Sequence, residues 1–388
     1  MRLVPLALLL VACPGPKVPE DTEETDTDAD SDTDTDADSD TDTDTDTDTD
    51  ADIYTGIIVT SDYTSGVVAT VTEDGVVTQD VLAVTGDTVV ATQADWTFLL
   101  NRSSEDTVQM YNGSDFSAPI AEFSTGDGTN PQDARVCGDH LFVSLLAADH
   151  LGVYDYGTSL SVGTVDLSAF DDGDGSPEAG ALWLAPDGYL YVALQQIDYA
   201  ITYASADGSG TLVKVDCAAM EVVDSWDIGP NPVLAPHGSD PDKVWVYGGD
   251  YYLPDYSGPK LDGGIWSFDS AAASLEGPFL TEEDAGYNVG NLTANADGNA
   301  LITLDDGYAW GVYCLDLASW EYTLAADGNL FVAGGATWPD GSVSVVQRTG
   351  FGSGAGTVGT VTYDLATCTA TETHATTLEP YSFAIVQE

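Results

Sequence analysis

Apolar residues beyond residue 52 occur in short runs that are separated by turn-forming residues. Runs such as Gly56–Thr60, Leu141–Leu145 and Leu190–Leu194 each lie close to Gly, Asp, Asn or Pro. Short apolar runs punctuated in this way are typical of β-strands joined by β-turns. No long stretch has the 3.6-residue apolar period of an amphipathic helix. The pattern therefore predicts an all-β domain.

The strand-and-turn pattern also repeats about every 40 to 55 residues. Its first landmark is a turn followed by an apolar strand, and its second is a strand that ends on Asp, as in Leu212–Asp216. A repeat of this length that contains several short strands indicates a β-propeller. The first landmark occurs at Thr85–Val90, Cys137–Val143, Pro186–Val192, Asp240–Val246, Ala296–Ile302 and Pro339–Val345.

These six repeats and a weaker one over Ile57–Thr85 predict seven blades, each a four-stranded antiparallel sheet. We expect the final run, Tyr381–Gln387, to add a strand to the first blade and close the ring. Residues 53–388 are thus expected to form one propeller domain. A six- or eight-bladed ring and a pair of β-sandwiches are the alternatives, and the regular repeat argues against the sandwiches.

The turn-strand landmark, as in Pro186-Asp187-Gly188-Tyr189-Leu190-Tyr191-Val192, resembles that of bacterial seven-bladed propellers of the YVTN and NHL-like type. The resemblance covers about Ile53–Glu388. Its motifs are structural and imply the architecture, whereas function depends on sites that the fold carries. Propellers of this kind also include lactonases, lyases and quinoprotein dehydrogenases.

The first residues of the chain are typical of an export signal. Arg2 precedes an apolar run, Leu3–Ala12, that is too short to span a bilayer as a helix. Leu10–Cys13 resembles a bacterial lipobox, which implies a signal peptide at residues 1–12 and lipidation of Cys13. An ordinary signal peptide with an incidental cysteine is the alternative. Because Pro14 follows in place of an acidic retention residue, we expect a lipid-anchored envelope protein, at the outer membrane or cell surface.

Residues 13–52 are expected to form a disordered acidic linker. From Asp26 to Asp52 every even-numbered residue is Asp, with Thr, Ser or Ala between. Such a segment has no apolar face to bury and repels itself, so it stays extended. It resembles the Asp-Thr tracts that follow a lipobox in secreted proteins of myxobacteria. We interpret it as a stalk, with weak cation binding or O-glycosylation as alternatives.

The charge of the chain excludes two classes of partner. The formal net charge is -58, from 66 Asp and Glu against 8 Lys and Arg. Glu20–Asp52 carries 18 of the acidic residues, whereas Ile53–Glu388 carries 48 acidic and 6 basic residues. A nucleic-acid binder needs a basic footprint, and attraction to anionic lipid needs basic clusters. We therefore expect no nucleic-acid partner and membrane contact only through the lipid.

Four cysteines lie within the predicted propeller: Cys137, Cys217, Cys314 and Cys368. An even number in an exported domain favours disulfides, and three pairings are open. The absence of a Cys-x-x-Cys sequence argues against zinc or redox chemistry. Cys137 begins an inner turn, and a simply buried thiol is the alternative for it.

One group of carboxylates has the spacing of metal ligands. Asp172, Asp174 and Glu178 lie in the sequence Asp-Asp-Gly-Asp-Gly-Ser-Pro-Glu, directly before the run Ala179–Leu184. Ca²⁺ prefers several oxygen ligands from a tight turn that glycine permits. We predict a calcium site here, with Glu178 directed toward the face of the ring; a solvated acidic turn is the alternative.

Two long irregular segments are candidates for ligand recognition because loops on a rigid scaffold often carry binding sites. These are Asp198–Gly210 and Gly248–Gly264, and the second contains Tyr251, Tyr252 and Tyr256 as candidate ligand contacts. Tryptophans near the inner strands either line a binding surface or pack between blades. The five considered are Trp96, Trp183, Trp245, Trp310 and Trp338.

Two functions remain open from the sequence. The first is a non-enzymatic, monomeric binding or scaffold module on a stalk, with an envelope protein or a glycan as ligand. The second is a lactonase-like hydrolase or a lyase with a calcium-type site at the channel mouth. The four histidines lack the spacing of a zinc site and have no recognisable triad partners, which favours the first function.

Overall fold

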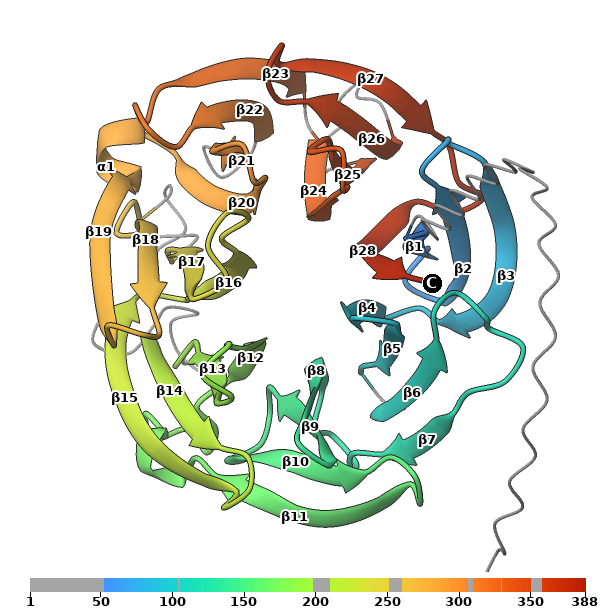
Figure 1. The fold of residues 1–388 in the computed structure, drawn as a ribbon, viewed down its shortest axis with the longest axis vertical. Coiled ribbons are helices and arrows are strands. Elements are labelled where there is room, and N and C mark those ends of the chain that lie inside the picture. Colours follow the sequence, from blue (N-terminus) through green and yellow to red (C-terminus); the bar gives the residue numbers. More distant parts are fainter. Residues whose placement is uncertain are drawn as a thin grey trace, which may run out of the picture. The chain divides into compact units, whose positions relative to one another are not determined.

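The computed structural model describes residues 52–103, 105–197, 210–250, 260–305, 310–328, 330–349 and 358–388. Their strands form seven four-stranded antiparallel sheets arranged as blades around an axis (Figure 1). The predicted all-β, seven-bladed propeller is confirmed. No helix in the described ranges is long and apolar enough to cross a membrane.

Blade 1 joins the two ends of the domain. The last strand, β28 (Pro380–Gln387), pairs antiparallel with β1 (Tyr54–Ser61), and this pairing confirms the predicted closure of the ring (Figure 1). The blade continues outward through β2 (Ser65–Thr72) and β3 (Val77–Thr85).

Each of the other six blades consists of four consecutive strands, which follow one another from the axis outward (Figure 1). Blades 2, 3 and 4 comprise β4 (Thr88–Gln93), β5 (Trp96–Asn101), β6 (Thr107–Asn112) and β7 (Ala121–Ser124); β8 (Pro131–Cys137), β9 (His140–Leu145), β10 (His150–Asp155) and β11 (Leu160–Asp166); and β12 (Ala179–Leu184), β13 (Leu190–Leu194), β14 (Gly210–Asp216) and β15 (Glu221–Gly229).

Blades 5, 6 and 7 follow the same plan, and two short helices lie in links between blades. The strands are β16 (Val233–Pro236), β17 (Lys243–Gly248), β18 (Gly264–Asp269) and β19 (Ser274–Thr281); β20 (Asn288–Ala294), β21 (Asn299–Asp305), β22 (Trp310–Asp316) and β23 (Tyr322–Gly328); and β24 (Leu330–Thr337), β25 (Val343–Thr349), β26 (Gly359–Asp364) and β27 (Thr369–His374). The helices are the 3₁₀ turn Ser168–Phe170 and α1 (Glu282–Ala285).

The apolar core is divided among the interfaces between blades. In β1, Ile57 and Val59 pack against blade 2, whereas Ile58 packs against blade 7. Successive side chains of a strand point to opposite faces of its blade. A strand whose blade lies between two other blades therefore buries the side chains of both faces. This explains why the apolar runs of the sequence are continuous. Among the described residues, every pair of adjacent blades shares one such cluster.

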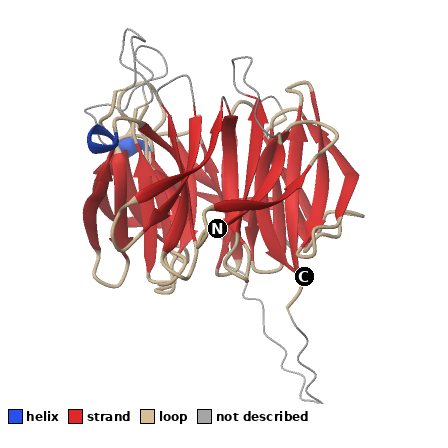
Figure 2. Cartoon of the chain, turned by 90° about the horizontal axis from the view of Figure 1, so that it is seen from above, coloured by secondary structure: helices blue, strands red, loops and turns tan. Residues whose placement is uncertain are grey.

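The two faces of the ring are built differently. In an antiparallel four-stranded blade, the first-to-second and third-to-fourth connections lie at one end, which we call the turn face. The second-to-third connections and the links between blades lie at the opposite end, which we call the loop face and which carries α1 (Figure 2). The repeated Asp-containing landmarks of the sequence fall on the turn face, except Thr85–Val90, whose Asp87 lies in the link between β3 and β4 on the loop face.

Many acidic residues of the turn face cap tight turns. Asp216, at the end of β14, accepts hydrogen bonds from the backbone N–H groups of Ala218 and Ala219 at 2.9 and 3.0 Å. Asp316 makes the equivalent bonds to Ala318 and Ser319. These bonds hold the pKa of Asp316 below its ordinary value. Part of the high acidic content is therefore explained by turn chemistry.

Two disulfides join neighbouring blades on the turn face. Cys137 at the end of β8 is bonded to Cys217 in the β14–β15 turn, which links blades 3 and 4. Cys314 in β22 is bonded to Cys368 in the β26–β27 turn, which links blades 6 and 7. The structure thus selects one of the three open pairings and shows Cys137 as a bonded residue.

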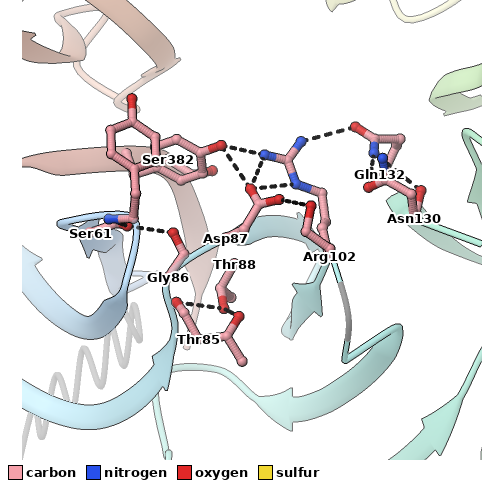
Figure 3. Close-up of polar contacts among 12 residues, drawn as sticks. Ser61, Thr85, Gly86, Asp87, Thr88, Arg102, Asn130, Gln132 and Ser382 are labelled. Carbon is pink, nitrogen blue, oxygen red and sulfur yellow. Dashed lines mark hydrogen bonds and ion pairs between the residues drawn. The ribbon is translucent and has the colours of Figure 1, made fainter. Parts of the chain in front are cut away.

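A polar network on the loop face joins β28 to blade 2 at the closure (Figure 3). The Arg102 guanidinium donates to Asp87 Oδ1, to Gln132 Oε1 and to the Tyr381 hydroxyl. The Tyr381 hydroxyl in turn donates to Asp87 Oδ1 at 2.8 Å. Burial raises the pKa of Tyr381 to about 12, so this hydroxyl remains a donor at neutral pH.

Candidate functional site

The predicted calcium ligands lie in the link between blades 3 and 4, on the loop face. Potential ligand oxygens of Asp171, Asp172 and Asp174 lie within 4.8 Å of one another, and these side chains are near the surface. Asp171 Oδ1 accepts hydrogen bonds from the N–H groups of Gly173 and Gly175. The structure therefore groups Asp171, which the sequence interpretation omitted, with two predicted ligands. Calcium binding stays a prediction.

Glu178, the third predicted ligand, does not belong to this group, and its carboxylate is hydrogen-bonded elsewhere. Its side chain is buried, accepts a hydrogen bond from Ser176 Oγ at 2.6 Å, and accepts another from the Ile197 N–H at 2.9 Å. Burial raises the pKa of Glu178 to about 7; the bond from Ser176 opposes this rise, and the negative charges of Asp174 and Asp172 add to it. Glu178 fastens the start of the β13–β14 connection to the blade.

A second buried glutamate, Glu282 in α1, fastens the β17–β18 connection. Its carboxylate accepts hydrogen bonds from the N–H groups of Gly263 at 2.9 Å and Val289 at 2.8 Å. Burial raises its pKa to about 7, the two amides oppose the rise, and the charges of Asp262 and Asp305 add to it. A Cβ at Gly249 would lie 2.4 Å from Glu282 Oε2, so any larger residue at position 249 would clash with the carboxylate in this position.

The candidate ligand contacts Tyr251, Tyr252 and Tyr256 lie outside the described residues, as does most of the Asp198–Gly210 segment. The tryptophans mainly pack between blades, as their ring distances show. The ring of Trp96 in blade 2 lies 5.8 Å from that of Tyr156 in blade 3, and the ring of Trp310 in blade 6 lies 5.2 Å from that of Phe331 in blade 7.

A groove of about 1050 Å³ lies on the turn face. It runs across blades 6, 7 and 1, between the turns at Asn295–Asn299, Trp338–Ser342 and Val71–Asp74. Trp338 lies in its wall with the indole Nε1 donating to Ser344 Oγ at 2.7 Å, and Asn295 Nδ2 donates to the Gly341 carbonyl at 2.9 Å. These bonds fix the shape of the groove.

Carboxylates dominate the polar lining of this groove, which contains neither Lys nor Arg. Some are occupied: Asp340 and Asp364 cap turns, and Glu372 lies 3.1 Å from His374 Nε2. Glu73 and Asp297 are exposed, and their carboxylates make no hydrogen bond or ion pair within the described ranges. Six carboxylates line it in all: Glu73, Asp74, Asp297, Asp340, Asp364 and Glu372.

Every Lys and Arg of the described ranges has an acidic partner. Arg135 Nη1 lies 2.6 Å from Asp133 Oδ1, Lys214 Nζ lies 2.8 Å from Asp187 Oδ2, and Lys260 contacts two aspartates. Longer pairs join Lys243 to Asp269 at 3.9 Å and Arg348 to Glu379 at 3.7 Å. The excess negative charge therefore remains on the surface and in the groove.

Comparisons with known proteins extend the description of the fold. No protein-family model matches the chain, and no curated protein is significantly similar in sequence. A crystal structure of a protein from Lactobacillus plantarum is similar with a TM-score of 0.56 and 14% identity, over 86% of this chain and 99% of that chain. AztD from Citrobacter koseri is similar with a TM-score of 0.49 and 11% identity, over 87% and 98% of the two chains. At these identities the likeness concerns the fold alone.

Proposed function

We propose that the protein is an exported, lipid-anchored β-propeller that acts as a monomeric, non-enzymatic binding module on an acidic stalk. Its ligand is a basic segment of an envelope protein, and the binding site is the acidic groove on the turn face. The observation that carries the proposal is the groove itself, because it combines about 1050 Å³ of space with six carboxylates and neither Lys nor Arg.

The chemistry of the groove supports a cationic ligand. Glu73 and Asp297 have no partner in the described part of the chain, so each is free to accept an ammonium or guanidinium group. The Trp338 region gives the groove a rigid wall. A negative potential over the surface also attracts a basic segment at long range and accelerates its association.

Fluorescence anisotropy with a labelled hexalysine peptide tests the groove. We expect saturable binding that weakens as salt is added, and no saturable binding of the same peptide after acetylation of its lysines. The double substitution Glu73→Gln and Asp297→Asn should weaken binding about fivefold, since exposed ion pairs contribute about 0.5 kcal/mol each.

The matched control is Glu221→Gln with Glu276→Gln, which removes the same charge from exposed positions on the outer strands of blades 4 and 5. This control variant should bind as the wild type does. Equal weakening by both double variants would show a general charge effect and would contradict a site in the groove.

The membrane anchor has its own test. Replacement Cys13→Ala should release the protein from the membrane fraction into the soluble fraction, because lipid attachment at Cys13 is the proposed anchor. Persistence of the variant in the membrane fraction would contradict lipid anchoring, and it would leave the groove experiment unaffected.

A further inference from the structure

A second cavity lies among the inner strands of the ring and differs in character from the acidic groove. Its volume is about 260 Å³, and its lining residues come from β4, β8, β12, β16 and the start of β17. Most of them lie in the halves of the inner strands nearest the turn face. This volume is slightly below the roughly 300–1,000 Å³ found for small-molecule sites, so the ligand must be small.

Most of the cavity wall is apolar. Trp183 and Leu184 contribute from β12, and Leu234 and Pro236 contribute from β16. The Trp183 ring lies 5.1 Å from the ring of Tyr191, which is fully buried, so the indole rests on a fixed surface. A wall of this kind suits the carbon skeleton of a small organic molecule.

Arg135 supplies the cavity with hydrogen-bond donors. Its Nη1 donates to Asp133 Oδ1 at 2.6 Å and to the Ala134 carbonyl at 2.7 Å. Within the described ranges its Nε and Nη2 make no hydrogen bond, and its side chain is 21% exposed. One edge of the guanidinium therefore remains for a ligand.

The buried carboxylate of Asp133 fixes the position of Arg135. Asp133 Oδ1 accepts from the Ala134 N–H at 2.8 Å, and Oδ2 accepts from the Leu182 N–H at 2.9 Å, across the interface between blades 3 and 4. Gln93 also lines the cavity. Its Nε2 donates to the Val136 carbonyl, and its Oε1 accepts from the Val136 N–H. Arg135 is thus the charged lining side chain with free donors.

We propose that this cavity binds a small organic carboxylate, with the carboxylate on the free edge of Arg135 and the apolar body against Trp183, Leu184 and Leu234. A planar guanidinium matches a carboxylate through two parallel hydrogen bonds, which gives both affinity and orientation. Asp133 is a positioning residue, because both of its carboxylate oxygens already accept hydrogen bonds and Oδ1 orients the guanidinium. The site is independent of the acidic groove and of any ligand bound there.

Isothermal titration calorimetry of the whole protein with benzoate, butyrate, inorganic phosphate and benzamide tests the site. We expect saturable binding of benzoate or butyrate at concentrations up to about 10 mM. Benzamide, which has the shape of benzoate without its charge, should bind at least about tenfold more weakly. Phosphate should also bind more weakly, since it has no apolar body for the wall.

Two variants locate the binding. Arg135→Gln should abolish carboxylate binding, but it leaves Asp133 buried without its cation and so endangers folding. Leu234→Trp fills the cavity from a different blade, leaves the Arg135–Asp133 pair intact, and should also abolish binding. Lys243→Gln removes a positive charge at the start of β17 and should bind as the wild type does; circular dichroism establishes that each variant is folded.

Three results would overturn the proposal. The first is absence of binding for every carboxylate by the wild-type protein. The second is carboxylate binding that folded Leu234→Trp and Arg135→Gln variants retain. The third is phosphate binding as tight as benzoate binding, which would indicate a general anion site without the apolar selection proposed here.

Discussion

The guanidinium of Arg348 lies over the ring of Tyr381, with 5.1 Å between the guanidinium carbon and the ring centroid. Its carbon also lies 4.5 Å from the centroid of Tyr63. Arg348 belongs to blade 7, whereas Tyr381 and Tyr63 belong to strands and turns of blade 1. A cation that lies over two neighbouring aromatic rings therefore connects the blades at the position where the two ends of the domain meet.

This relationship predicts that the closure of the ring depends on Tyr381. Tyr381→Phe keeps the ring beneath Arg348 but removes the hydroxyl that bonds to Asp87 and Arg102, so the free energy of unfolding should fall by about 1 kcal/mol. Tyr381→Ala removes both the ring and the hydroxyl, so it should lower the free energy of unfolding further. Urea denaturation measures both, with Tyr322→Phe in blade 6 as the control; a Tyr381→Phe variant as stable as the wild type would contradict this role of the hydroxyl.

The second prediction concerns pH and rests on Glu282. Its pKa is raised to about 7 in the folded protein, so between about pH 4.5 and 7 the folded state keeps a proton that the unfolded state has lost. The free energy of unfolding should therefore fall as pH rises through this range, by about 3 kcal/mol if the whole pKa difference contributes.

Chemical denaturation between pH 5 and 8 measures this slope, in units of free energy per pH unit. Glu282→Gln should reduce this slope, and Glu178, whose pKa is also raised to about 7, should supply the remainder. The variant loses an acceptor for one amide and should be less stable at pH 5. The exposed substitution Glu276→Gln is the control. A slope that is the same in the wild type and in Glu282→Gln would contradict the assignment.

The third prediction concerns the disulfide between Cys314 and Cys368, whose residues are 54 positions apart in the chain. A cross-link of this length restricts the unfolded chain, and its removal is expected to cost about 4 kcal/mol. Denaturation of the Cys314→Ser, Cys368→Ser double variant measures the loss. A reducing agent should destabilise the wild type further than the variant, because the variant retains only the Cys137–Cys217 bond.

The fourth prediction concerns ionic strength. Residues Ile53–Glu388 carry a formal charge of -42, and the basic residues of the described ranges are already paired. The remaining carboxylates repel one another, and salt shortens the range of this repulsion from about 30 Å at 0.01 M to about 3 Å at 1 M. The melting temperature should therefore be lower in dilute buffer than in molar salt. Equal melting temperatures would contradict this prediction.

The fifth prediction concerns calcium at the Asp171, Asp172 and Asp174 group. Calorimetry should detect Ca²⁺ binding to the wild type and its loss in Asp172→Ala with Asp174→Ala. Calcium at about 100 times its dissociation constant should stabilise the wild type by about 2.7 kcal/mol. Asp127→Ala, another exposed acid of the loop face, is the control. Identical titrations of the wild type and the double variant would exclude the site.

The repeat made the fold predictable, because each landmark has a local physical cause. The Pro186–Val192 sequence forms the turn and second strand of blade 4, and Leu212–Asp216 lies in its third strand, with Asp216 capping the next turn. The pairing of the last strand with the first blade was also predictable, because the apolar run Tyr381–Gln387 remains after the seven repeats are assigned to blades. These features depend on neighbours in the sequence or on the repeat itself.

The candidate sites were less predictable, since they combine distant parts of the chain. The groove unites Glu73, Asp297 and Glu372, which are brought together only when the ring closes. The Cys137–Cys217 pairing likewise depends on the packing of two blades. One signal was present: Asp133 and Arg135 are two residues apart, and residues at this spacing in a strand share one side.

The position of β1 has a mechanical consequence. It is the first strand of the domain, yet it lies between β28 and β2 and is hydrogen-bonded to both along most of its length. A pull on the proposed N-terminal tether would act along β1, so both rows of hydrogen bonds would bear the load in shear at the same time. If the first strand lay at the outer edge of a blade, a single row of hydrogen bonds would bear the load. The arrangement thus places two rows of hydrogen bonds in shear at the point where a surface tether would apply force.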